Sequence, residues 1–161
     1  MFSKVLLVDF KEGEIELKYL EKITALFEFH QFISRDDPYL FETLKDVDAI
    51  LAKISTKIDE EIIDRALHLK YIGVLSTAYD AIDAKYARLK NITVCNLGGY
   101  STEAVAEFFF ASLFEQAREL ERAKLQARHE DYSFDKFLGM ELKDKILGVI
   151  GGVKSGQELQ K

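Results

Sequence analysis

The sequence predicts an α/β fold built on a mainly parallel β-sheet. Short apolar runs that suit buried strands alternate with segments whose apolar residues recur at helical spacing. The interval between successive strands is that of right-handed βαβ units. Among the 161 residues there are only one proline and nine glycines, and 48% are hydrophobic, which is typical of an ordered globular chain.

The expected strands are short and rich in Val, Ile and Leu, as in a sheet that is covered on both faces. They are predicted at residues 4–9, 28–33, 49–54, 71–75 and 92–95. Parallel sheets place their ligand-binding loops at the carboxyl ends of the strands. The candidate loops are therefore those after Ala52, Leu75 and Cys95.

Helices are expected in the segments that join these strands. Residues 15–26 repeat apolar side chains at helical spacing, and Pro38 can open a short helix over residues 39–44. Asp59 is a candidate N-cap for the next helix, and another short helix is expected over residues 84–89.

Residues 101–128 contain no helix breaker and predict one continuous helix, with Ser101 as its N-cap. Such a helix would span about 40 Å at 1.5 Å per residue, which is long for one small domain to cover. We favour a helix shared between two domains or two subunits over a core helix with one stray aromatic, Phe108. The wide apolar face of the helix predicted over residues 101–128 consists of Ala106, Phe109, Phe110, Leu113, Ala117 and Leu120.

Residues 145–151 predict a further apolar strand, which a glycine-rich run follows. A strand, a glycine turn and a helix start form a cradle for pyrophosphate, because free N–H groups and the helix dipole favour anions. A dinucleotide fingerprint needs Gly at three positions. In this sequence those positions hold Gly151, Val153 and Gly156, so the second glycine is replaced by valine. Since Val153 obstructs the approach of the backbone to the pyrophosphate, a simple strand-to-helix turn is an equal alternative.

The charge balance is acidic, with a formal net charge of −6 and a pI near 5.2. This argues against a nucleic-acid partner, which would need concentrated Lys and Arg. The first nine residues lack the pattern of a signal peptide, and no window approaches the roughly 20 apolar residues of a membrane helix. We therefore expect no membrane partner and a cytoplasmic location.

The remaining reactive side chains offer few sites. The three histidines lie far apart and outside metal-ligand spacing, so no metal site is predicted. His68 is expected on the surface, and Cys95 is expected to be a small buried hydrophobe. Asp80 and Asp83 could be a carboxylate pair, but the favoured interpretation is that they cap the turn and helix after Tyr79.

Three linked segments resemble the NAD-dependent D-isomer-specific 2-hydroxyacid dehydrogenases. The family's substrate-loop region is similar to residues 69–83, LKYIGVLSTAYDAID. The strand, loop and crossing helix that follow are similar to residues 92–107, ITVCNLGGYSTEAVAE. The entrance to the family's Rossmann domain is similar to residues 139–151, with GMEL, Lys145 and GVIG. The match runs in register from about Val47 to Gly156, and several motifs in order are more specific than any one of them.

The resemblance implies three parts. These are a flavodoxin-like substrate domain of parallel sheet and flanking helices over residues 1–100, a long crossing helix over 101–128, and the start of a truncated NAD-binding Rossmann domain over 129–161. As substrate-binding residues it implies Ser55 in the cleft wall and the backbone N–H groups of Ser76, Thr77 and Ala78 for the carboxylate. Ala78 stands where the family usually has Gly, which questions the conformation of the loop.

For NAD, the resemblance implies that Thr102 and Val105 lie beside the nicotinamide, and that Gly151 and Gly156 belong to the pyrophosphate turn. The family's catalytic Arg, Glu and His correspond to positions beyond Lys161, so no catalytic residue is assigned. NAD is thus implied as a cofactor whose site is incomplete in this chain.

The sequence therefore predicts a truncated member of the D-2-hydroxyacid dehydrogenase family. The implied reaction is NAD-dependent hydride transfer between a small 2-hydroxy acid and its 2-oxo acid, and the chain alone is expected to be inactive. One alternative is a non-catalytic interaction module that forms a homo-oligomer through residues 101–128. Another is a domain that binds small carboxylates.

Overall fold

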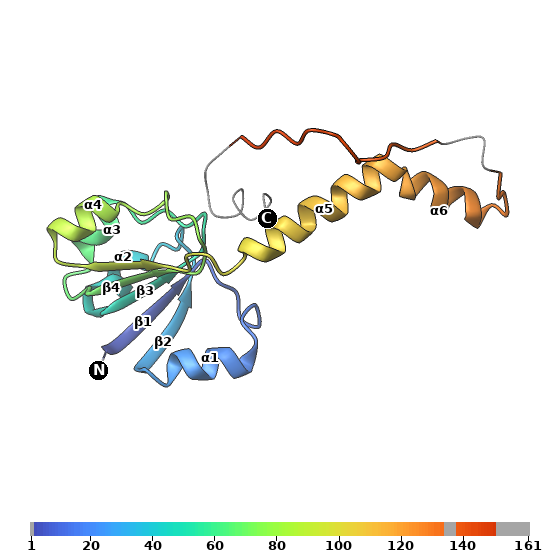
Figure 1. Cartoon of the computed structure of the whole chain (residues 1–161). Helices are drawn as coiled ribbons and strands as arrows, with labels where there is room; N and C mark the ends of the chain where they lie inside the picture. Colours follow the sequence, from blue (N-terminus) through green and yellow to red (C-terminus); the bar gives the residue numbers. More distant parts are fainter. Residues whose placement is uncertain (1, 134–137, 151–161) are drawn as a thin grey trace. The chain divides into compact units, whose positions relative to one another are not determined.

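The computed structural model describes residues 2–133 and 138–150 of the chain (Figure 1). Two compact units are formed, Met1–Gly98 and Gly99–Lys161. The first unit contains the sheet, and the second contains the long helical segment.

The first unit is built on a five-stranded sheet in the order β2-β1-β3-β4-β5, with every neighbouring pair parallel. This confirms the predicted α/β class, and the strand order is that of flavodoxin-like sheets. Each of the five strands predicted for this unit is present, with ends shifted by at most two residues. The strands are β1 (Phe2–Val8), β2 (Phe27–Ile33), β3 (Ala49–Ala52), β4 (Tyr71–Val74) and β5 (Thr93–Asn96).

Short helices cover the two faces of the sheet (Figure 1). They are α1 (Leu17–Thr24), α2 (Leu40–Thr43) with the 3₁₀ turn η1 (Leu44–Asp46), α3 (Glu60–Arg65) and α4 (Ala84–Leu89). On one face, Val5, Leu7, Ala49 and Leu51 pack against apolar side chains of α1. On the other face, a larger core joins the sheet to α2, η1, α3 and α4. Burial of alternate residues on both faces explains the nearly continuous apolar strands.

Two helix starts follow the sequence prediction. Asp59 accepts a hydrogen bond from the Ile62 N–H at 3.3 Å and caps α3. Asp83 accepts one from the Tyr86 N–H at 2.9 Å and caps α4. A cap acts within three residues of itself, so local sequence is sufficient to predict it.

Asp48 joins the amino ends of three strands. Its Oδ2 accepts hydrogen bonds from the N–H groups of Ser3 and Lys4 at 2.8 and 3.2 Å, and its Oδ1 pairs with Lys70 Nζ at 2.9 Å. Burial alone would raise the pKa of the Asp48 carboxyl, but the hydrogen bonds from Lys70, Ser3 and Lys4 outweigh it and lower the pKa below its usual value. The charged carboxylate is therefore the form that the folded state favours.

The second unit contains α5 (Thr102–Arg118) and α6 (Leu120–Arg128). The prediction of one continuous helix over residues 101–128 is wrong, because Glu119 adopts the left-handed conformation between them (φ 50°, ψ 41°). At this break the Met140 N–H donates to the Ala117 carbonyl at 2.6 Å. That carbonyl would accept a bond from within α6 if the helix continued.

Two further predictions for this unit are corrected. Ser101 occupies the N-cap position of α5, but its side chain makes no capping hydrogen bond. Residues 145–150, expected to begin a Rossmann strand, have no regular secondary structure, and Ile146 is 98% exposed. A strand needs a neighbour for its backbone groups, and none pairs with this segment in the described part of the unit. Gly151, Val153 and Gly156 lie outside the described residues.

The Asp48 arrangement predicts an acid-sensitive fold. Because the pKa of Asp48 is lowered on folding, its stabilisation is fully present above about pH 4 and is lost as the pH falls through the folded-state pKa. Asp48→Asn should lower the free energy of unfolding at pH 7 by about 1–3 kcal/mol and flatten its pH dependence below pH 4. Urea unfolding at pH 7 and pH 3 measures both effects. Asp46→Asn, which alters a mostly exposed carboxylate, is the matched control, and an equal loss in both variants would contradict the account.

Candidate functional site

The parallel register brings two of the predicted loops together at the carboxyl ends of the strands. The N–H of Leu75, directly after β4, donates to the carbonyl of Ala52 at the end of β3, at 3.0 Å. The turn that carries Ser55 and the loop that begins at Ser76 therefore leave the sheet side by side. Parallel sheets bind ligands at the carboxyl ends of their strands.

The loop over residues 76–78 is held through its carbonyls and one hydroxyl. The Leu97 N–H donates to the Ser76 carbonyl at 2.9 Å, and Asn96 Nδ2 donates to the Thr77 carbonyl at 2.6 Å. Thr77 Oγ1 donates to the Leu97 carbonyl at 3.1 Å. The N–H groups of Ser76, Thr77 and Ala78 donate to no acceptor within the described residues. Three consecutive amide donors are thus available to an anion.

Ala78 fits this loop. Its φ is not among the positive values found along the chain, so the backbone conformation does not require glycine. Ser76 is 8% exposed and Ala78 is half-buried, whereas Thr77 is exposed. The alanine that stands in place of the family's usual glycine therefore introduces no backbone strain.

Ser55 lies exposed on the turn after β3, and its side chain makes no hydrogen bond within the described residues. The nearby cation, Lys53, pairs through Nζ with the Glu14 carboxylate at 2.5 Å and lies over the Phe10 ring at 5.2 Å from its centroid. Hydrogen bonds from Lys53 and from the Lys11 N–H lower the pKa of the Glu14 carboxyl. The charge of Lys53 is therefore already balanced.

Two residues that the sequence analysis missed lie beneath this turn. Thr56 is 1% exposed, and its Oγ1 donates to Asp9 Oδ2 at 2.8 Å. Asp9 directly follows β1, and Thr56 follows β3. The pair therefore lies between β1 and β3, where the chain changes the direction in which it adds strands to the sheet. We call these two side chains the Asp9–Thr56 clasp. The sequence signal that could have predicted this pair is an aspartate directly after one strand and a threonine shortly after the neighbouring parallel strand.

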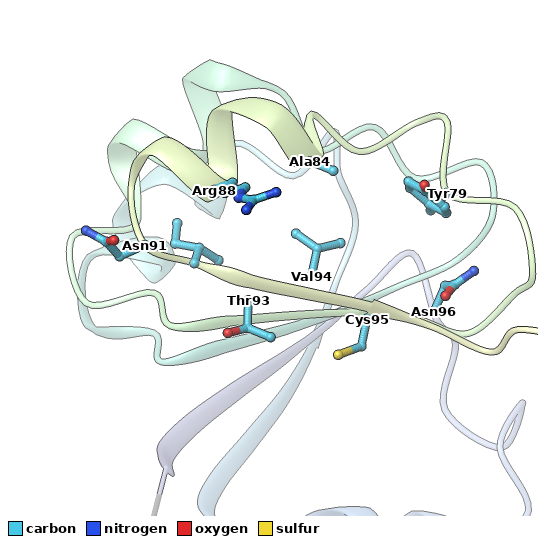
Figure 2. A pocket seen from close by; sticks show the side chains of 9 residues that line it. Tyr79, Ala84, Arg88, Asn91, Thr93, Val94, Cys95 and Asn96 are labelled. Carbon is cyan, nitrogen blue, oxygen red and sulfur yellow. The ribbon is translucent and has the colours of Figure 1, made fainter.

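A second concave feature lies beside the edge strand β5, which we call the β5 hollow (Figure 2). It measures about 580 Å³ and contains none of the four predicted substrate-binding residues. Among its described lining residues only Arg88 is charged. The lining residues are Tyr79, Ala84, Arg88, Asn91, Ile92, Thr93, Val94, Cys95 and Asn96. The β5 hollow therefore borders the 76–78 loop without containing its amides.

The prediction that Cys95 is buried is wrong, because its thiol is exposed. Figure 2 shows Cys95 on the face of β5 opposite to α4, while Val94 points toward α4. Because β5 is an edge strand, this face of β5 is less covered than the faces of the central strands. Burial and the adjacent Cys95 thiol raise the pKa of the Tyr71 hydroxyl on the neighbouring strand. By contrast, His68 is exposed, as predicted.

Only two of the four predicted cofactor residues lie within the described part of the chain. Thr102 and Val105 lie in the first turn of α5, in the second unit, and Val105 is exposed. Gly151 and Gly156 lie outside the described residues. The strand that should lead into the glycine turn is absent over residues 145–150. The described residues therefore do not form the strand-turn-helix cradle that pyrophosphate requires, and we derive no chemical step through NAD.

Comparison with known proteins points to one family. The model of the D-isomer specific 2-hydroxyacid dehydrogenase catalytic domain matches residues 5–132. The glyoxylate reductase of Thermococcus litoralis is 34% identical over 129 residues, which are 76% of this chain and 39% of that protein. The D-3-phosphoglycerate dehydrogenase of Archaeoglobus fulgidus is 32% identical over 149 residues, 92% of this chain and 28% of that protein.

A solved structure shows the same fold. The D-lactate dehydrogenase of Aquifex aeolicus, in complex with NAD and lactic acid, has a TM-score of 0.80 and 26% identity, covering 96% of this chain and 46% of its own. The chain thus spans less than half the length of these similar proteins. Within the described residues, no helix is both long and apolar enough to cross a membrane.

Proposed function

Because the chain belongs to the D-isomer-specific 2-hydroxyacid dehydrogenase family, we propose that its first unit binds the carboxylate of a small 2-hydroxy or 2-oxo acid. The observation that carries this proposal is the set of free N–H groups at Ser76, Thr77 and Ala78. The Ser76 and Thr77 carbonyls and the Thr77 hydroxyl are hydrogen-bonded to Asn96 and Leu97, so the loop is held before a ligand arrives. Preorganised donors bind an anion without a further ordering cost.

The surroundings favour a small acid with one negative charge. The carboxylate receives hydrogen bonds from the loop amides, and the Ser55 hydroxyl on the adjacent turn contacts the remainder of the ligand. Lys53 is paired with Glu14 and so offers no free cation for a second anionic group. Charge-assisted bonds from N–H groups to carboxylate are stronger than neutral ones, so the loop amides can hold one negative charge without the Lys53 cation.

We further propose that this chain alone does not transfer hydride. The implied reaction needs an acid–base group within about 3 Å of the reacting hydroxyl or carbonyl oxygen. His30 lies within β2, opposite Val5 of β1, and His68 precedes β4 at the amino edge. Neither histidine of the first unit lies at the carboxyl edge where the acid would bind.

Titration calorimetry with pyruvate tests the carboxylate proposal. We expect saturable binding to the full chain with Kd on the order of 1 mM, and none with methyl pyruvate, which keeps the skeleton but lacks the charge. Ala78→Pro removes one N–H donor and should raise Kd about tenfold or more, since a hydrogen bond to a charged group is lost.

Ala78→Gly is the matched control, because it keeps the N–H and should bind as the wild type does. Circular dichroism verifies that both variants fold. Equal affinity for pyruvate and methyl pyruvate would contradict the proposal. NADH oxidation with pyruvate above a blank would contradict the inactivity of the chain alone.

A second candidate function is self-association through residues 101–128. Exposed aromatic side chains gather on α5, where Phe108 is 75% exposed and Phe114 is also exposed. Phe110 contacts the rings of both Phe109 and Phe114, with centroids 5.4 and 6.4 Å apart. Exposed aromatic side chains in this number on one helix favour an interaction site.

Sedimentation analysis checks this candidate. We expect a dimer at micromolar concentration, and Phe108→Glu should shift it toward monomer because a buried charge without a partner opposes association. Leu89→Glu introduces the same charge at an exposed apolar position on α4 in the first unit, and it should leave the dimer intact. A wild-type chain that sediments as a monomer would rule this candidate out.

A further inference from the structure

The Thr56 hydroxyl holds both ends of the turn that carries Ser55. It donates its only hydrogen to Asp9 Oδ2 at 2.8 Å, and it accepts a hydrogen bond from the Lys53 N–H at 3.3 Å. The turn is also closed by the Thr56 N–H, which donates to the Lys53 carbonyl at 3.2 Å. Ser55 is therefore carried by a four-residue turn whose first and last residues are connected through one buried side chain.

Asp9 anchors this turn to the rest of the sheet. Its Oδ1 accepts a hydrogen bond from the Arg35 N–H, just after β2, at 2.7 Å. One carboxylate thus connects the carboxyl ends of β1, β2 and β3. Asp9 itself has a φ of 64°, a left-handed conformation that costs free energy in a residue with a Cβ. Such a conformation persists only where its surroundings hold it, and it is most frequent at functional sites.

The far side of the turn is fixed as well. Arg35 Nε donates to the Lys57 carbonyl at 3.1 Å, and the Arg35 guanidinium lies 3.5 Å from Asp59, the N-cap of α3. The segment from Lys53 to Asp59 is consequently held at its start, at Thr56 and at its end. The Ser55 side chain, in contrast, is exposed and makes no hydrogen bond within the described residues.

We propose that the Asp9–Thr56 clasp positions Ser55 for the carboxylic acid ligand, without touching that ligand itself. The clasp fixes the turn before binding, so the ligand does not have to order it. Asp9 and Thr56 are thus positioning residues of the carboxylate site. This inference rests on the proposed function. A purely structural clasp would affect the stability of the fold but leave the affinity of folded molecules unchanged.

The matched pair Thr56→Val and Thr56→Ser tests the inference in the full chain. Valine keeps the shape of threonine but removes the hydroxyl, whereas serine keeps the hydroxyl. We expect Kd for pyruvate to rise about tenfold in Thr56→Val and to stay near the wild-type value in Thr56→Ser. Titrations are made at a temperature where circular dichroism shows each variant fully folded, which separates affinity from stability.

A second variant removes the partner of Thr56. Asp9→Asn keeps the size of the side chain and its tolerance of positive φ, but it has one acceptor oxygen where Asp9 uses two. The clasp therefore loses either the hydrogen bond from Thr56 or the one from Arg35. Asp9→Asn should weaken pyruvate binding as Thr56→Val does. Asp36→Asn alters an exposed carboxylate in the turn after β2 and should bind as the wild type does.

Hydrogen exchange supplies a readout that needs no ligand. The Lys53 amide should exchange faster in Thr56→Val than in Thr56→Ser, because only valine lacks its acceptor. Equal pyruvate affinity in Thr56→Val and the wild type, or unchanged Lys53 exchange, would overturn the inference alone. Absence of pyruvate binding to the wild-type chain would overturn the proposed function, and with it this inference.

Discussion

The parallel pairing of five strands is the constraint on which the rest of the first unit depends. Parallel pairing places the carboxyl ends of all five strands at one end of the sheet and their amino ends at the other. One aspartate connects strands at each end of the sheet: Asp48 at the amino ends of β1, β3 and β4, and Asp9 at the carboxyl ends of β1, β2 and β3. The carboxylate loop after β4 and the turn after β3 become neighbours only because this register holds.

The carbonyl and N–H groups of the loop after β4 differ in their hydrogen bonding. A loop between a strand and a helix would ordinarily satisfy its N–H groups by turns or by water. Here the end of β5 donates to the carbonyls of Ser76 and Thr77, and the N–H groups of the same residues have no acceptor in the described part of the chain. The anion affinity we propose is thus a property of the backbone, and the side chains act by holding it.

Sequence alone predicted what is local or repeats with a simple period. The strands and the caps at Asp59 and Asp83 follow from patterns spanning a few residues. The break at Glu119 was missed because residues 101–128 contain no helix breaker, and the Met140–Ala117 hydrogen bond at the break joins positions 23 apart in the sequence. The clasp was missed because Asp9 and Thr56 lie 47 positions apart. The exposure of Cys95 depends on β5 lying at the edge of the sheet, which periodicity does not reveal.

Amide-resolved NMR during a pyruvate titration can show whether the amides of residues 76–78 bind the carboxylate. We expect the largest saturable shifts at the N–H signals of Ser76, Thr77 and Ala78, with smaller ones at Ser55. Shifts confined to the β5 hollow, at Asn91 and Thr93, or no saturable shift at the three loop amides, would contradict this expectation.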